Sequence, residues 1–279
     1  MNILKTSFFI AIAIITAIII FQCSKNNASS TGKECKILFL HHSTGAIIYK
    51  GGSSGILAQQ EVPKWFNNYN RENGTSYKIT EQEFPKSQPY GWNNYPYDYY
   101  NIWVKHAGNQ PYLEEPTLEM LTKEYNVIIF KHCFPVSNIL ENLDNADIDS
   151  PEKRLENYKL QYQALKQKLT QFPEVKFLVW TGAALIEAQT TPENAARAEI
   201  FSEWVKNEWD TDGDNIYVWD FRELETEGGL YLKKEYAGSS GDSHPGKDFA
   251  KTVAPLLCQR IVDVIENNGA KTTLTGKPL

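Results

Sequence analysis

The sequence predicts an α/β protein in which a parallel sheet lies between two layers of helices. Short apolar segments alternate with longer amphipathic segments, and polar turns bound each apolar segment. Strands and helices that alternate in this way are expected to form right-handed βαβ units, which make neighbouring strands parallel. No internal repeat or low-complexity linker interrupts residues 35–268, so we expect one domain there and a C-terminal tail over residues 269–279.

Five short segments rich in β-branched or aromatic residues are predicted as buried strands. They cover residues 36–41, 77–84, 126–131, 175–180 and 215–220. Three later stretches carry apolar residues every three or four positions, as one face of a helix does. Ser150 and Pro151 are expected to open the first of these helices, Thr191 and Pro192 the second, and Pro245 the last.

The first residues indicate export from the cytoplasm. Lys5 precedes an uncharged apolar run that ends at Cys23, which is typical of a secretory signal and short for a membrane span. The run, the cysteine and the polar stretch after it resemble a bacterial lipoprotein signal, which implies lipidation of Cys23. We expect residues 1–22 to be a signal peptide and residues 23–34 a flexible tether. An uncleaved membrane anchor is the alternative.

The composition limits the possible partners. The chain has 34 acidic and 28 basic residues, so nothing in its charge indicates a nucleic-acid partner. Beyond Cys23 there are three cysteines, Cys35, Cys133 and Cys258, which cannot all pair within one chain, so a disulfide scaffold is not indicated. The membrane is expected to be contacted through the lipid anchor only, with the protein secreted across the inner membrane and held at the cell envelope, periplasmic or cell-surface.

The residues best placed for chemistry follow the first strand. Ligands of such sheets bind beyond the carboxyl ends of the strands, where Ser43 is expected to lie. A serine hydroxyl needs a base, and neighbouring His41 and His42 are poorly aimed at it, which leaves them structural tasks. His244, in a Gly- and Ser-rich loop before the last helix, is the best candidate base, and Asp242 is close enough in sequence to orient it.

These two segments resemble blocks of the SGNH or GDSL hydrolases. FLHHSTG stands where that family has its Gly-Asp-Ser block, and GDSHPG where it has its Asp-x-x-His block. The resemblance implies a doubly wound, three-layer, flavodoxin-like sandwich with a five-stranded parallel sheet. It also implies Ser43 as nucleophile and His244 as base, with Asp242 as the orienting acid and no metal or organic cofactor.

The resemblance further implies an oxyanion hole made by the backbone N–H groups of Ser43 and Gly91 and the side chain of Asn138. His132 or Ser137 could take the place of Asn138, which lies far along the chain from the third strand. The family's aspartate lies three residues before its histidine, whereas here the separation is two. A Ser–His dyad aided by a backbone carbonyl therefore stays open.

Residues 84–113 form an insertion rich in tyrosine, tryptophan and proline. Its rings either pack over the sheet or form a wall of the binding site, with Tyr90 and Trp92 as candidate substrate-binding residues. His132, which follows the third strand and could face the same cleft, is a further candidate. Another segment, 210–215, has acidic residues at alternate positions like a calcium loop. Its glycine and twelfth position do not fit that motif, so we expect a turn before the fifth strand and no metal site.

These inferences together predict a serine ester hydrolase that forms an acyl-serine intermediate. The expected substrate is a small-molecule or polysaccharide ester, with an acetyl ester of a carbohydrate preferred. A lipid or lysophospholipid esterase is one alternative. A glycan-binding lipoprotein that keeps the hydrolase fold without turnover is the other.

Overall fold

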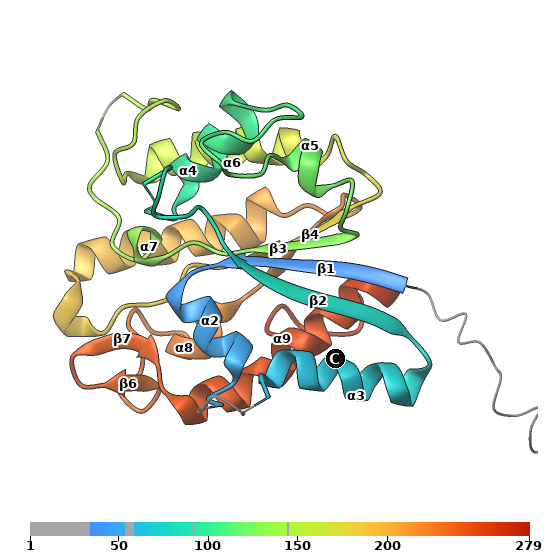
Figure 1. The fold of residues 1–279 in the computed structure, drawn as a ribbon. Coiled ribbons are helices and arrows are strands. Elements are labelled where there is room, and N and C mark those ends of the chain that lie inside the picture. The colour runs from blue at the N-terminus through green and yellow to red at the C-terminus, as the bar shows by residue number, and fades with distance from the viewer. Residues whose placement is uncertain (1–33, 54–58, 92, 144) are drawn as a thin grey trace, which may run out of the picture.

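The computed structural model describes residues 34–53, 59–91, 93–143 and 145–279. Five parallel strands form one sheet in the order β2-β1-β3-β4-β5, with helices on both faces (Figure 1). The strands are β1 (Glu34–His41), β2 (Ser76–Glu83), β3 (Val127–Phe130), β4 (Lys176–Trp180) and β5 (Ile216–Trp219). The predicted α/β sandwich with a five-stranded parallel sheet is confirmed, and each strand lies within two residues of its predicted bounds.

Helices α4 (Pro96–Tyr100), α5 (Leu118–Leu121), α6 (Leu155–Leu169) and α7 (Pro192–Trp204) cover one face of the sheet (Figure 1). Helices α2 (Ser43–Lys50), α3 (Glu61–Asn73), α8 (Phe221–Thr226) and α9 (Lys247–Asn267) cover the other. Because both faces of the sheet are covered, the central strand β3 is apolar throughout, and all four of its residues are buried. Two hydrophobic clusters, one on each face, form the core.

Two helix starts differ from the prediction. Helix α6 begins at Leu155, because residues 153 and 154 are held in an extended bridge in which Leu140 N–H donates to the Lys153 carbonyl at 2.8 Å. The last helix begins at Lys247, because Pro245 ends a strand. Thr191 is the N-cap of α7, as predicted, and its hydroxyl accepts from the Asn194 N–H at 3.2 Å.

A short antiparallel hairpin that the sequence did not predict lies beside the sheet. It consists of β6 (Ala237–Ser239) and β7 (Asp242–Pro245), and β7 packs against helix α2. The segment 237–245 is rich in glycine and serine, which gives no strand signal. The hairpin carries both Asp242 and His244.

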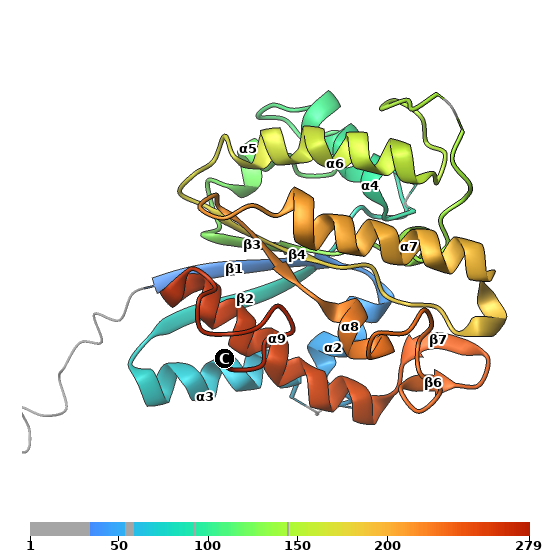
Figure 2. The ribbon, with the colours of Figure 1, turned by 180° about the vertical axis from the view of Figure 1, so that it is seen from behind.

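The C-terminal residues are docked on the domain. The Asp220 N–H donates to the Leu274 carbonyl at 2.9 Å, and the Trp219 indole donates to the Thr275 carbonyl at 3.0 Å. Figure 2 shows this segment beside α9. The predicted signal peptide, Cys23 and nearly all of the predicted tether lie outside the described residues. In the part of the chain that is described, no helix has the length and apolar character needed to cross a membrane.

Candidate active site

Ser43 follows β1, the strand at which the order of the sheet reverses. Strand β2 lies on one side of β1 and strand β3 on the other, and ligands of doubly wound folds bind in the crevice at such a switch point. Only His42 separates the end of β1 from Ser43, which is exposed as the first residue of α2. Its backbone N–H has no acceptor within the helix, because the first turn of a helix leaves its N–H groups free.

Asp242 and His244 form a hydrogen-bonded pair on β7. The ring Nδ1 lies 2.6 Å from the Asp242 Oδ1, which also accepts the backbone N–H of His244 at 3.0 Å. Residues two apart in a strand point to the same side, so a separation of two brings the carboxylate to the ring. A carboxylate only accepts hydrogen bonds, so Nδ1 carries the proton and Nε2 keeps a lone pair.

The charge of Asp242 is stabilised by its partner. The backbone N–H of His244, and then its ring, hold the pKa of the Asp242 carboxyl below its ordinary value. The carboxylate is therefore ionised at neutral pH and fixes the ring tautomer. Side-chain exposures of 33% for His244 and 48% for Asp242 leave the pair open to solvent.

Three segments that are distant in sequence meet near the pair. Helix α2, which opens with Ser43, contacts β7. Phe134, in the turn after β3, lies edge-on to the His244 ring, with ring centroids 5.2 Å apart. No described residue makes a hydrogen bond to the Ser43 hydroxyl, so Ser43 and His244 lie on two elements that are in contact but are not hydrogen-bonded to each other. Catalytic hydrogen bonds are often long until substrate is bound.

His41 and His42 hold the end of β1 in place. The His41 Nε2 lies 2.8 Å from the Glu81 Oε2 on β2, and the His42 Nε2 lies 2.6 Å from the Pro85 carbonyl oxygen. His41 also explains why Gly45 is glycine, since a Cβ there would lie 2.4 Å from the His41 Cβ. Both histidines have the structural tasks expected of them.

Besides the Ser43 N–H, the candidate oxyanion donors are Gly91 and Asn138, which lie in the segments that follow β2 and β3. Gly91 is exposed and has φ of 82°, a conformation that suits glycine. The Asn138 Oδ1 accepts from the Thr190 hydroxyl at 2.8 Å and from the Asn194 side chain at 3.0 Å. The oxygen of Asn138 is thus engaged, and its amino group is the part left to donate. Ser137 donates to the Ala183 carbonyl and is buried.

Most rings of the 84–113 insertion pack in the core. Tyr95, Tyr99 and Trp103 are each at most 3% exposed. The Tyr90 hydroxyl donates to Asp98 at 3.1 Å and accepts from Asn101 at 3.1 Å, which ties its ring to the insertion. Trp92 lies outside the described residues. Packing over the sheet therefore accounts for these rings.

His132, a candidate substrate-binding residue, lies inside the protein. It is 2% exposed among the rings of Tyr99, Phe130 and Tyr162, and neither ring nitrogen has a hydrogen-bond partner in the described part of the chain. Both faces of a parallel sheet are covered, so a residue just beyond a strand can turn into the core. This position gives His132 no access to a substrate at the surface.

The burial of His132 predicts acid sensitivity. Burial, reinforced by Lys131, lowers the pKa of His132 to about 3. The unfolded chain binds a proton below about pH 6.5 and the folded chain does not, so stability is lost as the pH falls from 6.5 towards 3. When the pH is lowered from 7 to 5, the free energy of unfolding should fall by about 2 kcal/mol less in a His132→Phe variant than in the wild type. Urea unfolding at both pH values measures this; equal losses would contradict the buried, neutral ring.

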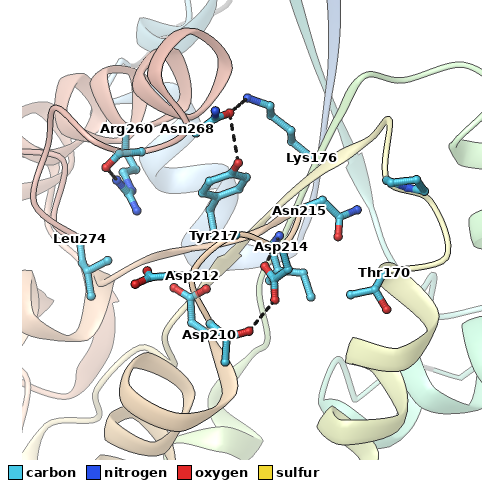
Figure 3. Close-up of a pocket in the computed structure, with 15 residues that line it drawn as sticks. Thr170, Lys176, Asp210, Asp212, Asp214, Asn215, Tyr217, Arg260, Asn268 and Leu274 are labelled. Atoms are coloured by element: carbon cyan, nitrogen blue, oxygen red, sulfur yellow. Dashed lines mark hydrogen bonds between the residues drawn. The ribbon is translucent and has the colours of Figure 1, made fainter.

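The acidic segment 210–215 lines a cavity of about 590 Å³ at the opposite, amino-terminal edge of the strands (Figure 3). The segment is a turn that leads into β5, as predicted. Asp214 accepts from the Thr211 hydroxyl and the Ile216 N–H and pairs with Lys166. Within the described residues, no group of three His, Cys, Asp or Glu side chains is arranged to hold a metal ion.

A cavity of about 800 Å³ lies beside the hairpin. Residues 186–188 of the loop after β4 line it together with residues 229–235 and with Ala237, Ser239 and Ser240 of the hairpin. It borders the hairpin at the β6 side and its turn, whereas Ser43, Asp242 and His244 do not line it.

Comparison with known proteins does not assign this chain to a family. No family model matches the sequence, and no curated protein matches it. One similar solved structure is a carbohydrate esterase, described as having an active site with divergent catalytic and non-catalytic binding functions. It is 13% identical, with a TM-score of 0.37 over 82% of this chain and 65% of that chain. This chain thus spans less than two thirds of that structure, and a likeness of this size carries no functional argument.

Sequence reasoning did not single out Phe134 or the loop that supports the hairpin. Phe134 follows β3 at the same edge as Ser43, so its place after a strand was the available signal. The supporting loop, residues 181–191, contains Gln189 and Thr190, whose contacts depend on the unpredicted hairpin and on Asn138.

Proposed function

We propose that this protein is a serine ester hydrolase with Ser43 as nucleophile, His244 as base and Asp242 as orienting acid. The observation that carries the proposal is the Asp242–His244 hydrogen bond, on a strand that packs against the helix opened by Ser43. A base oriented by a third group beside a nucleophile is the arrangement that serine hydrolysis needs.

In the first half of the proposed reaction, the Ser43 Oγ attacks the carbonyl carbon of the ester while His244 Nε2 takes the hydroxyl proton. The tetrahedral intermediate carries a negative oxygen, to which the Ser43 N–H, the Gly91 N–H and the Asn138 amino group are the candidate donors. One such donor is typically worth about 3–4 kcal/mol in the transition state. The carbon–oxygen bond then breaks, and His244 returns the proton to the leaving alcohol.

In the second half, a water molecule attacks the acyl-serine while His244 takes one of its protons. The new tetrahedral intermediate collapses, the acid leaves, and the proton returns to Ser43. The ionised Asp242 stabilises the imidazolium that forms twice in the cycle. No metal or organic cofactor takes part in these steps.

The preferred substrate is an acetyl ester on a carbohydrate polymer. The support is the openness of the site, since Ser43 is exposed and a third of the His244 side chain is exposed. An open site admits a bulky chain that carries a small acyl group, whereas a long acyl chain needs an enclosed apolar channel. The proposed lipid anchor at Cys23 would hold the domain at the cell envelope, where such polymers occur.

A second function is favoured by one observation. The Ser43 hydroxyl and the His244 ring are not hydrogen-bonded to each other, which suits a glycan-binding protein that keeps the fold without turnover. Such a protein would still need the open edge of the sheet but would not need an activated serine.

Labelling with a fluorophosphonate probe separates the catalyst from the binder. An activated serine forms a covalent bond to the probe phosphorus and expels fluoride, so the wild type is expected to be labelled and Ser43→Ala is not. Ser76→Ala, at the first residue of β2 and so at the opposite, amino-terminal edge of the sheet, is the matched control and should be labelled like the wild type. Failure to label the wild type, or labelling that survives in Ser43→Ala, would refute the assignment. Release of acetate from acetylated polysaccharides, compared with hydrolysis of long-chain acyl esters, then tests the substrate class.

A further inference from the structure

The side chains of Asp242 and His244 are placed by the strand that bears them. Among the described residues, their only side-chain hydrogen bonds are those within the pair itself. Both side chains are substantially exposed, so packing fixes them only in part. The direction in which the imidazole points therefore depends on how the β6–β7 hairpin is attached to the rest of the domain.

Ser243, between the two, points to the opposite side of the strand and is 1% exposed. Its Oγ accepts the Ile186 N–H at 3.0 Å and donates to the Gln189 Oε1. The Gln189 Nε2 in turn donates to the Gly241 carbonyl at 2.8 Å. One carboxamide thus binds the hairpin at positions 241 and 243, on either side of Asp242.

We propose that Gln189 is a positioning residue, which clamps the hairpin to the loop after β4 and so aims the Asp242–His244 pair at Ser43. The inference rests on the proposed function, and it concerns a residue outside the three that react. In the described part of the chain, the Gln189 side chain makes no hydrogen bond to Ser43, Asp242 or His244, so it acts through the hairpin backbone and Ser243.

The same turn also supports the candidate oxyanion donor. Thr190, the next residue, donates to the Asn138 Oδ1, and the amino group of Asn138 has no acceptor among the described residues. Two consecutive residues of one loop therefore have different partners: Gln189 binds the hairpin that carries His244, and Thr190 binds the candidate donor Asn138. A displacement of about 1 Å in such groups can lower a rate by about 100-fold.

The test compares Gln189→Met with Gln171→Met. Methionine matches the length of glutamine and removes both hydrogen bonds; Gln171 is exposed at the other edge of the sheet, and no described residue bonds to its side chain. On a p-nitrophenyl acetate substrate, Gln189→Met should lower kcat by about 10- to 100-fold with little change in KM. The Gln171→Met variant should have the kcat and KM of the wild type. Gln189→Glu keeps the acceptor for Ser243 but sets a second acceptor oxygen against the Gly241 carbonyl, so its kcat should also fall below that of the wild type.

A readout independent of turnover separates this inference from the proposed function. The downfield NMR resonance of the His244 Nδ1 proton reports the pair directly, and carboxyl titration reports the pKa of Asp242. In Gln189→Met, the resonance should broaden or disappear and the Asp242 pKa should rise towards its ordinary value. An inactive wild type would refute the hydrolase, and the NMR comparison would still decide the clamp. An unchanged kcat, or a lowered kcat with both NMR signals unchanged, would overturn it.

Discussion

A His244→Ala variant is expected to lose about 10⁵- to 10⁶-fold in kcat, because removal of the base leaves the Ser43 hydroxyl protonated and poorly nucleophilic. Its KM should change little, since the imidazole acts mainly in the transition state. The fold should persist, because the ring is partly exposed and its hydrogen bonds are local to the hairpin. Steady-state kinetics on an acetyl ester measure the loss, and circular dichroism checks the fold.

The matched control is His106→Ala. His106 stacks on Tyr112 at a centroid distance of 3.6 Å and lies in the aromatic insertion, outside the proposed machinery. It should keep the wild-type kcat. A double variant, Ser43→Ala with His244→Ala, should be no slower than either single variant, because residues that act as a unit are not additive. Additive losses, or a His244→Ala rate near that of the wild type, would contradict a nucleophile and base that work together.

The sheet was predictable because parallel strands buried on both faces need continuous apolar runs, and those runs are visible in the sequence. The ends of the strands followed from the same signal, which placed Ser43 at the carboxyl edge. Helix ends were less predictable. The start of α6 depends on a bridge between Leu140 and Arg154, a contact between segments that no local pattern reveals.

The environments of the site residues were predicted only in part. The position of His132 after β3 indicated the cleft, but Tyr99 of α4 and Tyr162 of α6 pack against the ring and enclose it. The Asp242–His244 spacing raised doubt because the family that the segment resembles separates the two residues by three positions and this chain by two. On a strand, residues two apart share a face, so the geometry came from the hairpin, whose Gly- and Ser-rich sequence carried no strand signal.

The docked C-terminal segment has a similar explanation. Residues 269–279 lack apolar periodicity, so they were expected to be a tail. Their attachment is polar: the buried Asp263 carboxylate accepts the Lys271 N–H, at 3.0 Å for the shorter of two contacts, and the Thr272 N–H at 2.9 Å. A buried carboxylate needs such donors, but the sequence does not reveal which segment supplies them.

An Asp242→Asn variant is expected to lower kcat by about 10²- to 10⁴-fold. An asparagine can turn its amino group towards Nδ1 and stabilise the tautomer that carries its proton on Nε2, which cannot accept the Ser43 proton. It also removes the charge that stabilises the imidazolium. The lower part of this range applies if solvent screens the carboxylate charge, since 48% of the Asp242 side chain is exposed.

Kinetics of Asp242→Asn should be compared with those of Asp212→Asn, an exposed aspartate at the opposite edge of the sheet that should leave kcat unchanged. The pKa of Asp242 lies below its ordinary value, so the wild-type carboxylate stays charged at pH 6 and above, and the comparison can be made there with the full charge in place. A wild-type rate in Asp242→Asn would mean that Ser43 and His244 act as a dyad. The local Asp242–His244 hydrogen bond would then serve to shape the hairpin, and the base would be oriented by its backbone surroundings instead.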